Sequence, residues 1–285
     1  MSNLMTRLTD ALPGLDAFAD NLKRAGDPIF GPDGPAPVKD ALYGVWLEHP
    51  LHPPVTDIPI GAWSLTALFD LLGEEEAADA TLKVGVVGAV GSAVTGLAQW
   101  YDLQNMEEPR RLGAAHAMLN TAALGLYLAS WAARNKGDRG VGIATALAGL
   151  GLSGVSAWIG GDLAYRLGIG VSRVAFQSPP TEWTDVAPVN EVPEGELVRV
   201  EIRKGVPVVL LREGDTIHAA SNTCTHVGGP LHKGERDGTC VTCPWHSSEF
   251  DLRDGSVVHG PATAPLDVLE GRIVDGQVQL RAVPA

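Results

Sequence analysis

Cys224-Thr-His226 and Cys243-Pro-Trp-His246 decide the fold and the chemistry of the C-terminal part of this 285-residue sequence. In each pair a cysteine precedes a histidine by two or three positions, and sixteen residues separate the pairs. Thiolates and imidazoles are ligands for metals such as iron and zinc. Two thiolates can bind one iron and two imidazoles a second, so the pattern predicts a binuclear iron–sulfur cluster.

A zinc site is the alternative interpretation of the same cysteines. Cys240 and Cys243 form a Cys-x-x-Cys pair that could bind zinc together with Cys224 and His226. That arrangement would leave His246 without a role and would not explain the order of the ligands. The sequence therefore favours two irons, and Cys240 is expected to be a small buried apolar residue on a strand.

The residues around the two pairs resemble the ligand loops of Rieske ferredoxins. CTHVGGPL at 224–231 and CPWHSSEFDLRDGSVVHGPA at 243–262 carry the resemblance, which covers residues 195–283. The resemblance implies a small antiparallel β domain whose two loops meet at one tip. It also implies one [2Fe–2S] cluster per chain, with the two cysteines and two histidines of the pairs as its ligands.

The second loop departs from the high-potential members of this family. Ser248 falls where those members have a serine that donates to the cluster, and Pro244 precedes it in the same loop. Phe250 stands in place of a tyrosine and has no hydroxyl to donate. Gly229 and Trp245 replace the disulfide-bonded cysteines of quinol-oxidising subunits. The resemblance thus implies a low-to-middle potential within the roughly −150 to +300 mV that Rieske centres span.

Alternating apolar residues also predict strands in this part of the chain. Residues 197–202 and 206–211 have the two-residue period of a strand, and Gly205 and Gly214 mark the turns beside them. Ser247 stands where the family usually has a glycine, and its effect on the loop does not follow from the sequence.

Four long apolar stretches fill the N-terminal half. They cover residues 58–72, 84–98, 112–133 and 141–161. The last two hold no charged side chain over about twenty residues, the length that crosses a bilayer. Recurring glycines permit the close helix packing that membranes require. The predicted fold class is therefore α+β multidomain, with an all-α transmembrane four-helix bundle at 49–171, a linker at 172–194 and an antiparallel β domain at 195–285.

Residues 38–171 also resemble a family of small four-helix membrane modules of unknown function. The resemblance is carried by HPLHPP at 49–54, DIP at 57–59, Ala115-His116 and GGDLAY at 160–165. This family implies a membrane location and brings little chemistry with it.

The N-terminal segment, residues 1–48, is expected to begin with an amphipathic helix. Apolar residues recur at helical spacing, with charged residues between them: Leu4, Leu8, Leu12, Leu15, Phe18 and Leu22, then Arg7, Asp10, Asp16 and Lys23. This helix could lie on the bilayer surface or pack on the chain's own helices, and the pattern favours neither. It lacks the continuous apolar core of a signal peptide.

Four spans would place a set of polar residues on the same side as the β domain. They are His49, His52, Asp57, Trp100, Asp102, His116, Asp162 and Tyr165. One interpretation is a second cofactor site, either a b-type haem held by His52 and His116 or a quinone pocket that uses His116 and Asp162. The other is a hydrogen-bonded cluster that closes the end of the bundle, and the sequence favours it.

Charge and length restrict the function further. Residues 181–285 carry nine lysines and arginines against sixteen aspartates and glutamates, which favours a partner with a basic docking surface and argues against nucleic acid. The absence of a twin-arginine signal favours a cytoplasmic β domain on a plasma or inner membrane. Thirty-nine residues after His246 leave no room for the mononuclear-iron domain of an oxygenase.

These features predict a membrane-anchored one-electron carrier that serves a reductase or oxygenase, and they favour a carrier over a stand-alone enzyme without deciding between the two. Two alternatives stay open at this point. One is a quinol-linked or haem-containing membrane oxidoreductase, and the other is a redox- or iron-responsive sensor. The sequence names neither the electron donor nor the acceptor.

Overall fold

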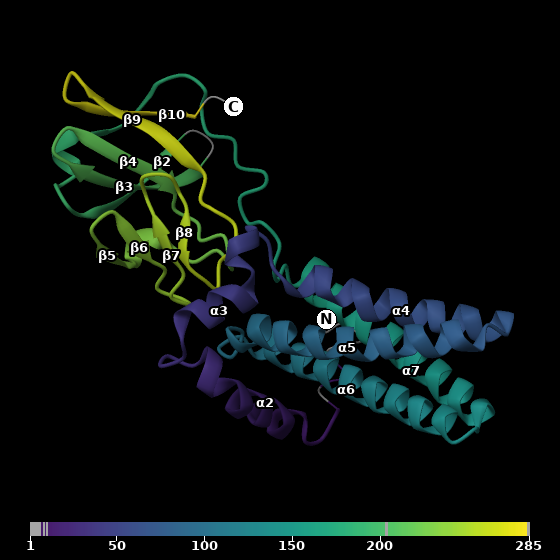
Figure 1. Ribbon diagram of the computed structural model, residues 1–285. Coiled ribbons are helices and arrows are strands. Elements are labelled where there is room, and N and C mark those ends of the chain that lie inside the picture. Colours follow the sequence, from purple (N-terminus) through teal and green to yellow (C-terminus); the bar gives the residue numbers. More distant parts are fainter. Residues whose placement is uncertain (1–6, 8, 10, 203–204, 284–285) are drawn as a thin grey trace. The chain divides into compact units, whose positions relative to one another are not determined.

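The computed structural model describes residues 7, 9, 11–202 and 205–283, and the chain divides into two compact units (Figure 1). The first unit is helical and comprises residues up to 42 together with 51–169. The second comprises residues 43–50 and 170–285 and is built mainly of antiparallel strands. The α+β fold class is thus confirmed. The expected helix positions Leu4, Leu8 and Asp10 lie outside the described residues.

Four long helices form the body of the first unit. They are α4 (His52–Leu72), α5 (Glu75–Tyr101), α6 (Glu107–Asn135) and α7 (Arg139–Gly161). All four are long and apolar enough to cross a membrane by length and composition. Each begins or ends beyond the predicted apolar stretch, because polar residues at the ends extend the helices. Glu75 and Glu107, for example, lie in first turns, where the helix dipole favours negative charge.

Glycines allow these helices to approach closely. A Cβ on Gly85 would lie 2.1 Å from Nε1 of Trp63, and one on Gly149 would lie 2.9 Å from Cε2 of Tyr127. The rings of Trp63 and Tyr127 stack on each other with centroids 3.7 Å apart. In lipid such close packing supplies the attraction between helices that the hydrophobic effect supplies in water.

Charged side chains close the end of the bundle at the α4–α5 and α6–α7 turns. The Arg134 side chain is 2% exposed and that of Asp70 is 4% exposed. Arg134 Nη1 donates to Oδ1 of Asp70 and to Oδ1 of Asp79, both at 2.9 Å, and Arg139 adds further bonds to both carboxylates. The charge that interrupts the first apolar stretch is therefore paired.

The amphipathic helix α2 (Leu15–Phe30) packs against α5 and α6. Leu15 and Ala19 are buried in a cluster with Trp100. On its polar side Asp16 forms salt bridges with the side chains of Arg110 and Arg111. The docked alternative is thus the one that the structure shows. A short helix, α3 (Ala36–Tyr43), follows it, and α7 ends in a π-helical turn, η2 (Asp162–Arg166).

Two antiparallel sheets make up the second unit. The larger has the order β1 (Thr184–Pro188), β10 (Gln277–Ala282), β9 (Val268–Val274), β4 (Thr216–Ser221), β3 (Val206–Glu213) and β2 (Leu197–Ile202). The smaller has the order β5 (Glu235–Asp237), β6 (Cys240–Thr242), β7 (Glu249–Asp251) and β8 (Val257–His259). Strands β2 and β3 lie where the alternating pattern predicted them, and Gly205 and Gly214 both have positive φ.

Strand β1 lies within the segment expected to be a linker. Thr184 pairs with Leu280 of β10. The guanidinium groups of Arg272 and Arg281 lie 4.0 and 4.6 Å from the ring centroid of Trp183, which precedes the strand. The sequence obscured this strand because it is short and ends in a proline within a proline-rich segment.

Truncation of the buried arginine tests the closed end of the bundle. Arg134→Ala leaves Asp70 buried with fewer partners, so the variant should lose about 3–5 kcal/mol of unfolding free energy. Chemical denaturation of the full chain in detergent measures this loss. Lys136→Ala, an exposed change two residues away, should stay within about 0.5 kcal/mol of the parent. Equal stabilities of the two variants would contradict the assignment of a buried ion network.

Candidate metal centre

The first Cys/His pair lies in a loop that closes on itself. The Cys224 N–H donates to the carbonyl of Gly229 at 2.9 Å, and the Gly228 N–H donates back to the carbonyl of Cys224 at 2.9 Å. Gly228 has a φ of 92°, in the left-handed region that glycine adopts without steric cost. A Cβ on Gly229 would lie 2.6 Å from Sγ of Cys243, so the missing side chain lets the two loops meet.

The second loop repeats this hydrogen-bond pattern at the same spacing. The Cys243 N–H donates to the carbonyl of Ser248 at 2.7 Å, and the Ser247 N–H donates to the carbonyl of Cys243 at 3.1 Å. Ser247 has a φ of 60° and thus occupies the position of Gly228 in the first loop. A serine there pays a steric cost that glycine avoids, while the path of the loop is kept.

The two loops bring the four predicted donors together. The residues Cys224 and Cys243 are each only 2% exposed. The rings of His226 and His246 lie edge to face, with centroids 5.0 Å apart. Nδ1 of His226 is buried and has no hydrogen-bond partner among the described residues. A buried nitrogen of this kind is costly unless a metal or a donor completes it, so the donor set fits a cluster with two thiolates and two imidazoles.

The zinc alternative requires three or four side chains around one ion. Cys240, which that alternative needs, lies half-buried on β6 opposite Asp251 of β7. Two pairs of donors, one pair for each of two irons, agree with this arrangement.

The surroundings of His226, His246 and Cys243 favour the protonation states in which these side chains bind metal, namely neutral imidazoles and a thiolate. Burial lowers the pKa of His226 to about 3, with a contribution from His246, and burial also lowers the pKa of His246. The contact between the two thiols lowers the pKa of Cys243 to about 6 and, together with burial, raises that of Cys224. The site therefore holds neutral imidazoles and favours the thiolate at Cys243, whereas a metal would have to displace the proton of Cys224.

The other predicted residues of this loop take different places. The fully buried Ser248 accepts the N–H of Ala262 at 2.9 Å through its Oγ, which leaves the hydroxyl proton to donate elsewhere. Pro244 is exposed, beside a Trp245 that is 52% exposed. Phe250 is fully buried in the apolar cluster that also contains both ligand-loop cysteines.

The histidines predicted for a second cofactor lie in the helical unit. His52 Nδ1 is 3.2 Å from Thr95 Oγ1, and His116 Nδ1 is 2.8 Å from the carbonyl of Ser156. Asp162, the other residue of the suggested quinone pocket, forms a salt bridge with Arg166 at 3.2 Å. The polar residues of this end are thus hydrogen-bonded, and both histidines have hydroxyl or carbonyl partners.

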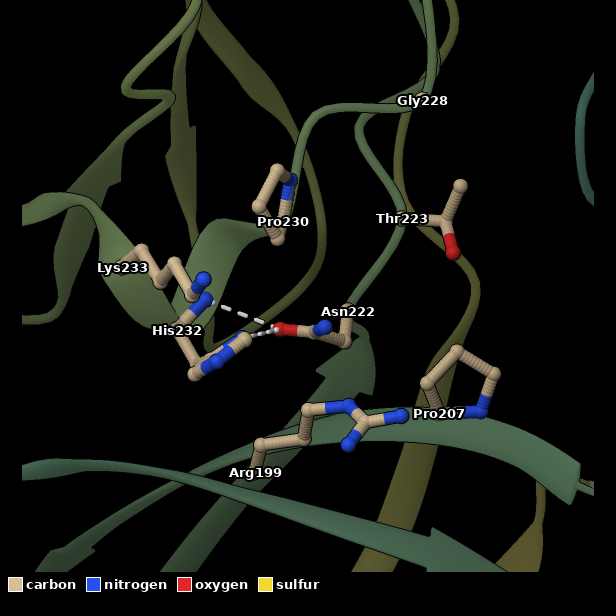
Figure 2. A pocket seen from close by; sticks show the side chains of 8 residues that line it. All are labelled: Arg199, Pro207, Asn222, Thr223, Gly228, Pro230, His232 and Lys233. Atoms are coloured by element: carbon tan, nitrogen blue, oxygen red, sulfur yellow. Dashed lines mark hydrogen bonds between the residues drawn. The ribbon is translucent and has the colours of Figure 1, made fainter.

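Asn222 is a residue of the centre that the sequence did not suggest. Its carbonyl accepts the N–H of Leu231 at 2.9 Å, and its side-chain Oδ1 accepts the N–H of His232 at 2.8 Å (Figure 2). It thus joins the two ends of the first ligand loop. The only signal in the sequence is an amide side chain between a strand and a metal-binding loop, where it commonly bonds the backbone.

A hollow lies beside this loop, and Figure 2 shows the side chains that line it. Arg199 and Lys233 give it a basic lining, within a domain that is acidic overall. The hollow beside the first loop is therefore positively charged, whereas the domain as a whole carries a net negative charge.

Fold and site together define a Rieske-type domain joined to a helical bundle. Residues 182–270 match the model of the Rieske [2Fe-2S] domain family, and residues 48–173 match that of a predicted membrane protein family, DUF2231. The chain belongs to the Rieske [2Fe–2S] family through its C-terminal part, and this domain is one that holds an iron–sulfur cluster.

Two ferredoxins agree with this assignment, and a chain in one solved structure is similar in sequence. Ferredoxin CarAc of Metapseudomonas resinovorans is 32% identical over 96 residues, which are 34% of this chain and 90% of that protein. The anthranilate 1,2-dioxygenase ferredoxin subunit of Burkholderia cepacia is 36% identical over 100 residues, which are 35% and 91%. A solved complex of reduced oxygenase and oxidised ferredoxin in carbazole 1,9a-dioxygenase contains a similar chain, 29% identical with a TM-score of 0.34. The match covers 37% of this chain and 99% of that one.

A methyl group at Gly229 tests the close meeting of the loops. In Gly229→Ala the new Cβ would need the space of Cys243 Sγ, so the variant should hold markedly less iron than the parent. Iron and acid-labile sulfide analysis of the purified full chain measures this change. Gly61→Ala, where a Cβ would meet nothing within 4 Å, is the matched control and should keep full iron content. Undiminished iron in Gly229→Ala would show that the loops do not meet as described.

Proposed function

We propose that this protein is a membrane-anchored one-electron carrier. Cys224 and Cys243 hold one iron of a [2Fe–2S] cluster, and His226 and His246 hold the other. The observation that carries the proposal is the meeting of two thiols and two imidazoles from two matching loops, in a chain that also has four helices able to cross a membrane. When bound, the cluster supplies a single-electron couple.

The residues of the site have separate roles in this proposal. The thiolates and imidazoles fix the cluster, while the loop hydrogen bonds and Asn222 hold the ligands in position. The hydroxyl of Ser248 donates a hydrogen bond towards the cluster, which stabilises its reduced form. Phe250 and the apolar cluster around it exclude water beneath the site. His246 is half-exposed and beside the exposed Trp245, so its ring edge is the exit for an electron.

The partner is an oxidoreductase that meets this edge in a transient contact. The name of one relative supports this part, because that protein is the ferredoxin subunit of anthranilate 1,2-dioxygenase. The excess of carboxylates in residues 181–285 favours a basic docking surface on the partner, while the basic hollow beside the first loop would meet an acidic group there. Such a contact weakens as salt rises.

The helical unit anchors the carrier in the plasma or inner membrane, with the cluster domain on the cytoplasmic side. Support comes from the length and apolar composition of the four helices and from the match to a predicted membrane protein family. Anchoring confines the carrier to two dimensions and raises its effective concentration near membrane partners.

Replacement of the four ligands tests the proposed centre. Each of Cys224→Ala, His226→Ala, Cys243→Ala and His246→Ala should abolish the paramagnetic signal of the reduced cluster. The full chain should stay in the membrane pellet after a carbonate wash, because its helices are unchanged. Cys240→Ala is the matched control and should keep the signal, since that thiol lies apart on β6. Stoichiometric reduction should take up one electron per chain. A ligand variant that keeps the paramagnetic signal would refute the assignment of that ligand. A parent protein that stays in the supernatant would refute the membrane anchoring.

A hydroxyl at Phe250 tests the proposed low-to-middle potential. Phe250→Tyr offers a donor beside the cluster, and a net hydrogen bond of about 1 kcal/mol to its reduced form would raise the potential by roughly 40 mV. Potentiometric titration followed by paramagnetic resonance measures the shift. Phe250→Leu keeps the position apolar and should leave the potential close to that of the parent. An unchanged potential in the tyrosine variant would exclude this position as a donor site.

A further inference from the structure

The four-helix bundle consists of two copies of one helical hairpin. Each residue of the hairpin formed by α4 and α5 has a counterpart 64 positions later in the hairpin formed by α6 and α7. Asp70 and Arg134, for example, are such counterparts. Several pairs at this offset are identical: His52 and His116, Gly73 and Gly137, Thr81 and Thr145, Gly85 and Gly149, Ser92 and Ser156, Gly96 and Gly160, Tyr101 and Tyr165.

The packing follows the same offset. Gly85 lies against Trp63, and its counterpart Gly149 lies against Tyr127, the counterpart of that tryptophan. Glycines 73 and 137 both take a positive φ, of 76° and 82°, between the helices of their hairpins. The duplicated sequence positions therefore have duplicated structural roles.

Equivalent residues of the two hairpins also contact each other. Trp63 stacks on Tyr127, and Asp70 binds Arg134. Contact between a residue and its own counterpart occurs along a two-fold axis. The two hairpins are thus related by an approximate two-fold axis that passes between α4 and α6, as in membrane proteins built from parallel repeats, whose binding sites lie at the repeat interface.

His52 and His116 are the histidine pair among these equivalent residues. They lie towards the end of α4 and α6 that is opposite to Asp70 and Arg134. The ring of His52 packs on Gly96, and that of His116 packs on Gly160, its counterpart. His116 donates from Nδ1 to the Ser156 carbonyl at 2.8 Å. Nδ1 of His52 lies 3.2 Å from Oγ1 of Thr95, which donates to the carbonyl of Ser92, the counterpart of that serine. The two rings also lie near enough to interact electrostatically.

The hydrogen bonds determine which nitrogen is available. A carbonyl accepts only from a protonated Nδ1, so Nε2 of His116 carries the lone pair. The side-chain amide of Asn120, itself exposed, donates to that Nε2 at 3.1 Å. A ring held through Nδ1 by a backbone carbonyl is the usual arrangement of a metal-binding histidine, and the Asn120 amide would have to release Nε2 for a metal to bind there.

We propose that His52 and His116 are the two axial ligands of a b-type haem bound on the two-fold axis of the bundle. A haem iron needs two such ligands on opposite sides, and facing helices of a bundle commonly supply them.

Two other ligands fit this pair of histidines less well. A bare metal ion needs further protein ligands, and in the part of the chain that the structure describes no third His, Cys, Asp or Glu joins the pair. Haem brings four ring nitrogens of its own. A quinone needs donors for its carbonyl oxygens, whereas an unprotonated Nε2 only accepts. Asp162, the other group considered for a quinone, is bound to Arg166.

Absorbance of the full chain, expressed with added haem precursor and purified in detergent, tests this proposal. We expect a Soret band with one haem b per chain. His52→Ala and His116→Ala should each lower haem affinity by more than about tenfold, the loss that even an outer-shell change can cause. His49→Ala, three residues before the first ligand, is exposed and should keep the parent spectrum.

Methionine variants separate ligation from a purely structural role. His52→Met and His116→Met retain a ligand atom and should keep haem with a shifted spectrum, which a packing role would not produce. The paramagnetic signal of the reduced cluster should be unchanged in every variant, so a failure of this proposal is distinct from a failure of the proposed carrier. A parent without a Soret band, or alanine variants with the parent's haem content, would overturn the proposal. Loss of quinol binding without haem in these variants would also overturn it.

Discussion

Closure of two short loops against each other is the constraint on which the C-terminal unit depends. Each loop commits the N–H and the carbonyl of its cysteine to a ring of backbone bonds, so the thiol direction is set by the main chain. The rings need a left-handed residue at the fourth position after each cysteine, which is Gly228 in one loop and Ser247 in the other. The small sheet and the apolar cluster that contains both cysteines keep the two rings facing each other.

Much of this centre followed from the sequence because its chemistry is local. Two Cys/His pairs in short segments predicted both the ligand type and the β fold around them. Residues that act across the fold were harder to find. Asn222 joins the ends of a loop through bonds to Leu231 and His232 that its own position does not reveal. The role of Ser247 depends on a backbone angle, and β1 depends on two arginines from distant strands.

The helical unit shows the same division. Long apolar stretches predicted four helices, since length and composition suffice to identify them. The packing of these helices depends on which glycine lies against which aromatic ring, as Gly85 does against Trp63. The apolar stretches alone do not reveal these contacts. The relation between the hairpins is equally hidden, because most equivalent positions differ in residue type. It becomes visible where the buried members, such as Gly85 and Gly149, contact equivalent rings.

The opposite charges of Asp70 and Arg134 have a consequence for self-association of this chain. If two chains packed their first hairpins against each other, the two Asp70 carboxylates would meet in an apolar interior. If two second hairpins packed together, the two Arg134 guanidinium groups would meet. Like charges without water between them repel strongly. Each hairpin therefore accepts only the complementary one, and their covalent linkage delivers it at once. Association of like hairpins between neighbouring copies of the chain is thereby disfavoured, whereas an exchange that sets a first hairpin against a second one would keep the Asp70–Arg134 pair.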